Sequence, residues 1–240
     1  MEKRYFRQLI LNEIGPDGQA KLAQSAVLVV GAGGLGSPAL TYLAAAGVGC
    51  LGILDSDVVD ASNLNRQFLH GSADIGHAKV QSARDRLVHL NEDIDIHTHE
   101  VHLSDDNAIS LLGGYNLVIG AVDSFATRFV MNRACVTLGL PYIDGGVKGF
   151  GGWVMFVQSP QTPCLNCIFP QKKAKKEPIG VLGTTAGVIG TIEANIALLH
   201  LLGLTNPLES KLLMYDGMRM NMNSIDIAHD ERCAVCGSTS

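Results

Sequence analysis

Residues 26–57, AVLVVGAGGLGSPALTYLAAAGVGCLGILDSD, decide the fold. The apolar run 27–30 ends in glycines, and the small residues of 35–46 follow with helical spacing. Gly47 closes that helix, because glycine suits the residue after a helix C-terminus. A second apolar run follows at 50–55. Strand, glycine turn, helix and strand in this order form a βαβ unit, whose right-handed crossover places both strands in one parallel sheet.

The alternation of strand and helix continues toward the C-terminus. The spacing of apolar residues predicts helices over 79–91, 105–112, 124–138 and 181–203, and strands over 94–99, 117–121 and 142–144. Glycines with alternating bulky residues at 146–158 predict antiparallel strands, and 211–227 predict a hairpin. Residues 2–24 are expected to be helical and broken at Gly15-Pro16. We therefore expect an α/β, Rossmann-like fold whose mostly parallel central sheet continues into antiparallel strands.

Composition limits the classes of function. The chain has 240 residues, 47% hydrophobic and 17% charged, which suffices for one large domain, or one domain with an appended lobe, around a sizeable core. Its net charge of −5 provides no basic field, so we expect no nucleic-acid or membrane partner. The charged N-terminus does not resemble a signal peptide, and Glu193 and His200 interrupt the longest apolar run. We expect a cytoplasmic protein.

A glycine-rich turn indicates nucleotide binding. Gly31, Gly33, Gly34 and Gly36 satisfy G-x-G-x-x-G between a strand and a helix. Glycines let backbone N–H groups approach phosphates, and the helix N-terminus favours an anion. Asp55 ends the second strand, where an acid hydrogen-bonds ribose hydroxyls, while Asp57 could join it or simply be solvated.

The residues after this unit favour phosphate chemistry over hydride transfer. Helical spacing places Asn63, Arg66 and Gln67 on one side of a short helix. Arg66 and Lys79 can neutralise a triphosphate and its transition state, although each alone is more often a surface charge.

Asp123 is a candidate magnesium ligand. It follows the predicted strand 117–121, at the carboxyl edge of the sheet where open α/β folds bind ligands. A carboxylate there can hold Mg²⁺ that bridges phosphates. The alternative is N-capping of the helix 124–138, and the residue could serve both purposes.

Four of the six cysteines form two C-x-x-C pairs. Cys164 and Cys167 make the first pair, and Cys233 and Cys236 the second. Four thiolates are the usual ligand set of tetrahedral structural zinc, which would tie the C-terminus back to the lobe that follows the sheet. Unmetallated pairs or a redox pair are the alternatives. Cys50 and Cys135 lie in a predicted strand and a predicted helix, where an inert buried thiol is favoured.

Several motifs together carry a family resemblance. RYFRQ (4–8), GAGGLG (31–36), DSD (55–57), SNLNRQ (62–67) and GHAKV (76–80) occur in order, before Asp123 and the cysteine pairs. This set resembles the ThiF/MoeB/HesA family, bacterial relatives of the ubiquitin-activating enzymes. The resemblance covers nearly the whole chain. It implies ATP- and Mg²⁺-dependent adenylation of the C-terminal glycine of a small ubiquitin-like sulfur-carrier protein ending in Gly-Gly.

The resemblance also assigns roles. Asp55 would hold the ribose, Asn63, Arg66 and Lys79 the phosphates, and Gln67 would shape the pocket. Asp123 would bind magnesium, and Arg7 would reach the ATP site of a neighbouring subunit, which implies a homodimer. The resemblance further implies a single domain over 1–240, with a helical arm (1–25), a nucleotide-binding part (26–145) and a part with the antiparallel strands, zinc site and carrier-binding lobe (146–240).

The chain departs from the family pattern in two places. Residues 168–187, IFPQKKAKKEPIGVLGTTAG, lack the cysteine that thiamine-type and ubiquitin-type members carry there. We therefore expect adenylation alone, with sulfide supplied by another protein and no rhodanese-like domain after Cys236. The usual threonine-aspartate-asparagine reads Val122-Asp123-Ser124 here. The lysines at 172, 173, 175 and 176 could guide an acidic carrier tail, but a solvated loop is the favoured interpretation.

Three other functions stay open from the sequence. A NAD-dependent oxidoreductase explains Gly31 to Gly36 and Asp55 but leaves Arg66, Lys79 and the cysteine pairs without a role. An inactive scaffold subunit conflicts with the intact charged set. A relative that activates another carboxylate, such as a peptide C-terminus, is compatible with every motif. The pathway, whether molybdopterin, thiamine or another, stays open too.

Overall fold

A computed structural model describes residues 2–169 and 180–237. The helices are α1 (Glu2–Leu9), α2 (Gly15–Ala23), α3 (Gly36–Ala46), α4 (Lys79–Leu90), α5 (Asp105–Leu112), α6 (Phe125–Leu138), α7 (Leu165–Ile168) and α8 (Gly183–Leu202), with 3₁₀ turns η1 (Ala61–Asn63) and η2 (Ser72–Asp74). The strands are β1 (Ala26–Val30), β2 (Cys50–Leu54), β3 (Asp95–His99), β4 (Leu117–Gly120), β5 (Tyr142–Lys148), β6 (Gly151–Val157), β7 (Lys211–Asp216) and β8 (Asn221–Asp226). The lysines at 172–176 lie outside the described residues.

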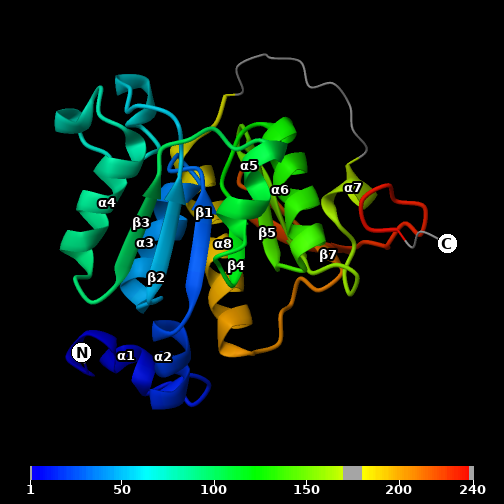
Figure 1. The fold of residues 1–240 in the computed structure, drawn as a ribbon, viewed down its shortest axis with the longest axis horizontal. Helices are drawn as coiled ribbons and strands as arrows, with labels where there is room; N and C mark the ends of the chain where they lie inside the picture. Colours follow the sequence, from blue (N-terminus) through cyan, green and yellow to red (C-terminus); the bar gives the residue numbers. More distant parts are fainter. Residues whose placement is uncertain (1, 170–179, 238–240) are drawn as a thin grey trace.

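All the strands belong to one eight-stranded sheet with the order β3-β2-β1-β4-β5-β6-β7-β8. The strands from β3 to β5 are parallel (Figure 1). The strands from β5 to β8 are antiparallel. The chain moves from β1 toward β3 and then returns to β4 on the other side of β1. The strand order therefore reverses between β1 and β4, where open α/β sheets bind ligands beyond the carboxyl ends of their strands.

Helices cover both faces of the sheet, and each face has its own core. Alternate residues of β1 point to opposite sides: Val27 and Val29 join the core under α3, α4 and α8, while Leu28 and Val30 join the core under α5 and α6. Burial on both faces explains why the central strands are continuous apolar runs. The expected α/β class with a parallel core and antiparallel continuation is confirmed.

Two local expectations differ from the structure. Gly15-Pro16 begins α2 instead of breaking a helix, because proline fits the first turn of a helix, and the break lies at 10–14. Residues 61–63 form a 3₁₀ turn, and turns instead of a helix continue toward Gln67. Asp60 caps that turn by accepting from the Ser62 N–H at 2.8 Å. Such local side-chain bonds compete with regular helix.

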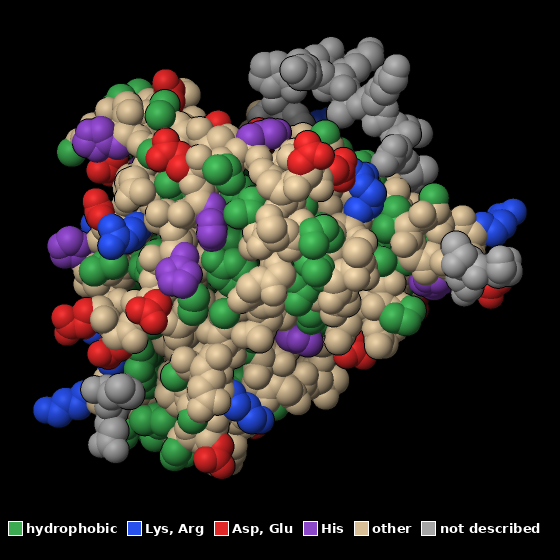
Figure 2. Space-filling view, viewed as in Figure 1, with side chains coloured by type: hydrophobic (Ala, Val, Ile, Leu, Met, Phe, Trp, Pro, Cys, Tyr) green, Lys and Arg blue, Asp and Glu red, His purple; other side chains and the backbone are tan. Residues whose placement is uncertain are grey.

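One helix in the described chain, α8, is long and apolar enough to span a membrane. It packs against α3, β5 and β6, so it serves here as a core helix. Gly190 allows the close approach to α3, since a Cβ there would lie 2.2 Å from the Leu35 carbonyl oxygen. Charged side chains of both signs are dispersed over the face in Figure 2, in keeping with the absence of a basic field.

A buried ionic cluster lies where the sheet turns antiparallel. Arg128 of α6 pairs with Asp144 of β5 at 2.7 Å, and Tyr142 donates a hydrogen bond to the same carboxylate. Arg128 also donates to the Val122 carbonyl, in the segment that carries Asp123. Glu193 of α8 is fully buried, and neither carboxylate oxygen has a hydrogen-bond partner among the described residues. Burial, reinforced by the charge of Asp144, raises the pKa of Glu193 well above its ordinary value.

This burial predicts how stability depends on pH. Because the folded pKa exceeds the unfolded one, the folded state binds more protons above about pH 4, and Glu193 lowers stability increasingly as pH rises. Glu193→Gln is expected to be more stable than wild type at pH 8, by about 1.4 kcal/mol for each pKa unit between the two states, with a smaller gain at pH 5. Thermal melts across this range test it, with exposed Glu100→Gln as control. Parallel melting curves for wild type and Glu193→Gln would contradict it.

Candidate functional site: a phosphate-binding turn and a four-cysteine cluster

The glycine turn between β1 and α3 depends on glycine at two positions. Gly31 has a φ of 104°, and a Cβ there would lie 2.5 Å from the Ala121 carbonyl oxygen. A Cβ on Gly36 would lie 1.9 Å from the Gly31 carbonyl oxygen. The turn is thus folded against itself and against the end of β4. This packing brings it to the point where the strand order reverses.

The turn presents unused hydrogen-bond donors. Among the described residues, no group accepts from the N–H of Gly33, Gly34 or Leu35. These groups lie at the start of α3, where the helix dipole also favours an anion. The arrangement can bind phosphate oxygens.

A stability comparison tests the turn. In Gly36→Ala the new methyl group collides with backbone, so we expect destabilisation by about 2 kcal/mol or more. In Gly33→Ala the nearest atom, Gln67 Nε2, is 3.5 Å away, so stability should change by less than ~0.5 kcal/mol. Urea unfolding of both variants measures the difference. Equal losses would show that the turn is not packed as described.

Asp55 lies against the glycine turn. One carboxylate oxygen accepts from the Ala32 N–H at 2.8 Å, and the other accepts from the Asp57 N–H at 2.9 Å. The carboxylate at the end of β2 therefore also stabilises the glycine turn. The ribose-binding role predicted for it stays a prediction.

Arg66 and Gln67 lie on the other side of the turn. A Cβ on Gly34 would be 3.4 Å from Arg66 Cγ, and one on Gly33 would be 3.5 Å from Gln67 Nε2. Their backbone N–H groups both donate to the carbonyl of Asn63, which begins this segment. Gln67 is 5% exposed, and its Oε1 has no partner among the described residues. The structure thus sets Arg66 and Gln67 beside the glycines, and Asn63 is joined to them through its backbone carbonyl.

Lys79 is paired with Asp57. Its Nζ lies 2.8 Å from Asp57 Oδ2, and its side chain is 7% exposed whereas that of Asp57 is 67% exposed. Lys79 opens α4, and its backbone N–H donates to the Asp57 carbonyl. A positive charge is thus held close to the turn with a solvated carboxylate as its counter-ion.

Asp123 is exposed two residues beyond Ala121, which packs on Gly31 and Gly36. The N-cap of α6 is Ser124, whose hydroxyl accepts from the Thr127 N–H at 3.5 Å. The capping alternative for Asp123 is therefore wrong, and its carboxylate is left available at the carboxyl edge of the sheet.

Arg7 is the predicted site residue that the fold separates from the others. Its helix, α1, is anchored by Tyr5, which packs on Gly47 and accepts from Asn91 Nδ2 at 2.8 Å. Gly47 caps the C-terminus of α3, whereas the glycine turn lies at its N-terminus. Arg7 is exposed at the far end of α3, about 16 Å along the helix from the turn.

Sequence reasoning missed His70. This histidine is 6% exposed, and its Nε2 lies 2.9 Å from the Ala32 carbonyl oxygen in the glycine turn. A lone histidine in an irregular segment gives no signal of such a contact, because the contact depends on how the segment folds back.

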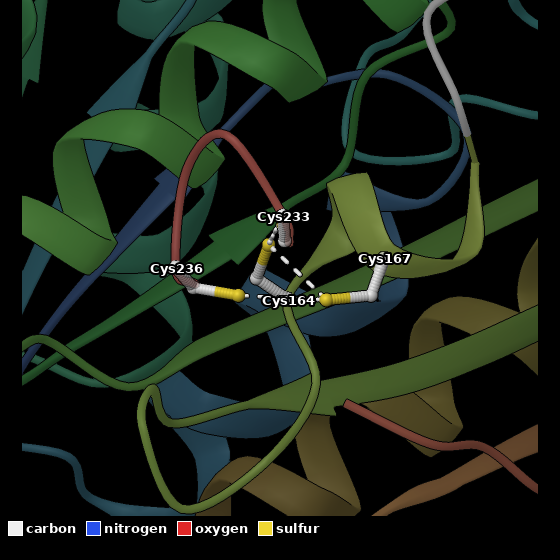
Figure 3. A group of neighbouring side chains, drawn as sticks. All are labelled: Cys164, Cys167, Cys233 and Cys236. Carbon is white, nitrogen blue, oxygen red and sulfur yellow. Dashed lines mark hydrogen bonds between the residues drawn. The ribbon is translucent and has the colours of Figure 1, made fainter. Parts of the chain in front are cut away.

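The two cysteine pairs meet in space (Figure 3). All four sulfur atoms lie within 4.8 Å of one another. The Sγ of Cys164 is 3.7 Å from that of Cys233, and the Sγ of Cys167 is 3.4 Å from that of Cys236. A tetrahedral zinc site with Zn–S bonds of about 2.3 Å separates its sulfurs by ~3.8 Å. The predicted four-cysteine cluster is confirmed, and its geometry fits Zn²⁺.

Neighbouring side chains hold the cluster in place. Buried Asn132 of α6 accepts from the Leu165 N–H at 2.9 Å and donates to Asn166 Oδ1 at 3.1 Å. His229 Nε2 lies 3.3 Å from Cys236 Sγ, at hydrogen-bonding distance. Such contacts orient metal ligands. With four sulfurs the site has no open position, which is typical of structural zinc.

The fold and the turn define an open, doubly wound α/β protein whose glycine turn, with N–H groups suited to an anion, lies where its strand order reverses. The chain belongs to the ThiF family, which matches residues 5–235.

Curated relatives are similar over nearly the whole chain. An adenylyltransferase and sulfurtransferase MOCS3 of Aedes aegypti is 42% identical over 97% of this chain, which spans 55% of that protein. The chain thus spans about half the length of such relatives. A sulfur carrier protein adenylyltransferase of Thermus thermophilus is 40% identical over 98% of the chain and 90% of its own length. A SAMP-activating enzyme E1 of Haloferax volcanii is 39% identical over 98% of the chain and 88% of its own length.

Solved structures share the fold. The chain resembles Escherichia coli MccB, crystallised with MccA-N7isoASN, with a TM-score of 0.89 over 99% of this chain and 75% of that one. A crystal structure of MccB with ATP matches with a TM-score of 0.88. Sequence identity is 21% in both comparisons, so they establish the fold alone.

Proposed function

We propose that this protein uses ATP to adenylate the C-terminal glycine of a small ubiquitin-like sulfur-carrier protein, with release of pyrophosphate. The observation that carries the proposal is the set of N–H groups of Gly33, Gly34 and Leu35, which have no acceptor in the part of the chain that the structure describes. Arg66 lies against Gly34, and Lys79 pairs with Asp57, whose N–H donates to the carboxylate of Asp55 that bonds the turn. The names of the curated relatives support the carrier as substrate. Residues 146–240 would provide the carrier-binding lobe, and two reduced cysteine pairs fit a cytoplasmic site of action.

The reaction needs positive charge more than it needs a base. The carrier's C-terminal carboxylate forms a bond to the α-phosphorus while the bond to the pyrophosphate oxygen breaks, giving an acyl adenylate. The nucleophile is already ionised, so no proton has to be removed. The obstacle is bringing an anion to a polyanion, which Arg66, Lys79 and the free N–H groups relieve by electrostatic stabilisation and orientation.

Other residues complete the nucleotide site in this proposal. Asp55, with Asp57 beside it, would hold the ribose edge, and Asn63 the phosphates. Gln67 would direct its unpartnered Oε1 and its amide at the bound nucleotide. The free carboxylate of Asp123 suits Mg²⁺, which when bound would neutralise phosphate charge.

We propose that the reaction stops at the adenylate. No cysteine occurs between Cys167 and Cys233 in the sequence, so no thiol of that segment is available for a thioester or mixed disulfide. Thr184 and Thr185, in the first turn of α8, cannot replace a thiolate in such chemistry. Transfer of sulfur to the carrier would therefore need a thiol outside that segment.

Arg7 would act in a homodimer. Within one chain it lies at the far end of α3 from the turn, so a role at an ATP site requires the arm of a second chain. In this arrangement each ATP site takes Lys79 from one chain and Arg7 from the other. A mixed dimer of one Arg7→Ala chain and one Lys79→Met chain therefore contains one intact site. We expect each variant alone to be inactive and randomly mixed chains to recover about a quarter of wild-type activity. No recovery in isolated mixed dimers would exclude action across subunits.

ATP–pyrophosphate exchange tests the proposed function. Purified protein with Mg²⁺ is combined with a panel of small carriers ending in Gly-Gly and with the same carriers lacking the last glycine. Exchange that requires one intact carrier supports adenylation and names the pathway. Measurable ATP binding without exchange for any carrier would overturn the proposal and favour a scaffold or another carboxylate. Binding of NADH in place of ATP would favour the oxidoreductase alternative.

A further inference from the structure

The Ala32 peptide groups in the glycine turn are held from two sides. The Ala32 N–H donates to Asp55 at 2.8 Å, and the Ala32 carbonyl oxygen lies 2.9 Å from His70 Nε2. The other ring nitrogen of His70, Nδ1, lies 2.8 Å from Ser82 Oγ on α4. Ala32 is fully buried and His70 is 6% exposed, so solvent does not replace either contact easily. Adenylation as described above gives His70 no part.

The partners of His70 define its tautomer. A carbonyl oxygen can only accept, so Nε2 carries the proton that bonds Ala32. Burial is the largest effect on the pKa of His70 and lowers it, and the charge of Lys79 lowers it further. The hydrogen bond to Ala32 and the charges of Asp74 and Asp55 raise the pKa, but the net shift is downward. The ring is therefore neutral near pH 7, and its bare Nδ1 accepts from the Ser82 hydroxyl. The Ser82 hydroxyl, which can donate as well as accept, suits the tautomer that the Ala32 carbonyl requires.

This contact sets the direction of an anion donor. The Ala32–Gly33 peptide is planar and trans, so its C=O and N–H point in opposite directions. Because the Ala32 carbonyl points toward buried His70, the Gly33 N–H of the same peptide points away from His70. Gly33 N–H is the first of the free donors, and Gly34 and Leu35 follow it along the turn.

We propose that His70 is a positioning residue of the phosphate turn: by holding the Ala32 carbonyl it aims the Gly33 N–H and so strengthens binding of a nucleotide polyphosphate. The inference rests on the proposed function only for the identity of that ligand. His70 does not touch the phosphates itself. Its contribution is a turn that is ordered before the nucleotide arrives.

A pair of amide substitutions separates this role from general packing. In His70→Gln the amide N–H can reach the place of Nε2 and keep the bond to Ala32, while in His70→Asn the amide ends near the place of Nδ1 and keeps only the Ser82 side. We expect His70→Asn to weaken Mg–ATP binding about 10-fold and to speed hydrogen exchange in a peptide covering 31–40, which includes the bonded N–H groups of Ala32 and Ser37. His70→Gln should restore both within about 3-fold.

His200→Asn is the matched control. His200 is another partly buried histidine whose pKa burial lowers, and it lies on α8 at the opposite end of the sheet against Phe156. It should change neither ATP affinity nor exchange at 31–40 by more than about 2-fold. In pyrophosphate exchange, His70→Asn should raise the KM for ATP with little change in the saturating rate.

The outcomes separate the two proposals. Equal ATP affinity and equal exchange at 31–40 for His70→Asn and His70→Gln would overturn the role of His70. So would a loss of stability in His70→Asn spread over the whole chain without a specific effect at the turn. If wild type binds ATP but activates no carrier, the proposed function fails while the comparison of affinities still stands. If ATP does not bind, hydrogen exchange at residues 31–40 alone tests the role of His70.

Discussion

Replacing Lys79 by methionine is expected to lower ATP–pyrophosphate exchange by about 100- to 1,000-fold. In the proposed function, the substitution removes a charge that would meet the phosphates as the α-phosphorus is attacked, at a side chain that is only 7% exposed. Methionine keeps the aliphatic stem packed, so the fold should survive. Asp57, at 67% exposure, remains solvated after losing its partner and leaves no buried charge behind. The measurement is initial exchange rate at saturating ATP and carrier.

Lys211→Met supplies the control for this loss. Lys211 is also paired with an aspartate, Asp226, at 3.2 Å, but it is 43% exposed and lies on β7 away from the glycine turn. Exposed ion pairs contribute little, so this variant should keep wild-type exchange. A loss in both variants would point to a general effect of removing lysine charge. Wild-type exchange in Lys79→Met would remove Lys79 from the reaction.

The second large effect concerns the four-cysteine cluster. Cys233→Ser is expected to release zinc and to lower the free energy of unfolding by about 3–5 kcal/mol, since binding of a structural metal is coupled to folding. For a chain of this size the melting temperature should fall by ~10 °C. Elemental analysis gives the zinc content, and a thermal melt with and without a chelator gives the stability.

Cys50→Ser is the comparison for that experiment. Cys50 is a half-buried thiol on β2 that does not belong to the cluster. We expect it to retain one zinc per chain and to melt within ~2 °C of wild type. If wild-type protein purified under reducing conditions contains no zinc, or if Cys233→Ser melts like wild type, a structural metal role is excluded.

Local patterns in the sequence predict the order of helices and strands and the position of the glycine turn. The G-x-G-x-x-G spacing and the alternation of apolar runs require no knowledge of distant contacts. The cysteine pairs were predictable as well, since two pairs with one spacing meet at a single metal. The reversal of strand order between β1 and β4 then brings Asp123 beside the turn without any further information.

The sequence did not predict contacts that depend on how segments fold back on one another. His70 reaches Ala32 only because the irregular chain after η1 returns beneath the glycine turn. Arg128 and Asp144 pair across α6 and β5, and helical spacing gave no reason to single out either residue. The Asp55 carboxylate accepts a hydrogen bond from the backbone N–H of Ala32. Motif reasoning instead assigned that carboxylate to a ligand.

The last strand of the sheet shows what the cysteine cluster protects. Every residue of β8 is exposed, so few side-chain contacts hold this strand against β7. Between Cys167 and Cys233, the described chain passes from the α6 face to α8 on the opposite face and returns through β7 and β8. A metal bound to both cysteine pairs would close this part of the chain into a loop. The loop would restrict detachment of β8 from the sheet. If β8 detached, the edge of β7, with Leu212, Leu213 and Tyr215, would be open to pairing with other chains. We therefore expect loss of the metal to promote aggregation.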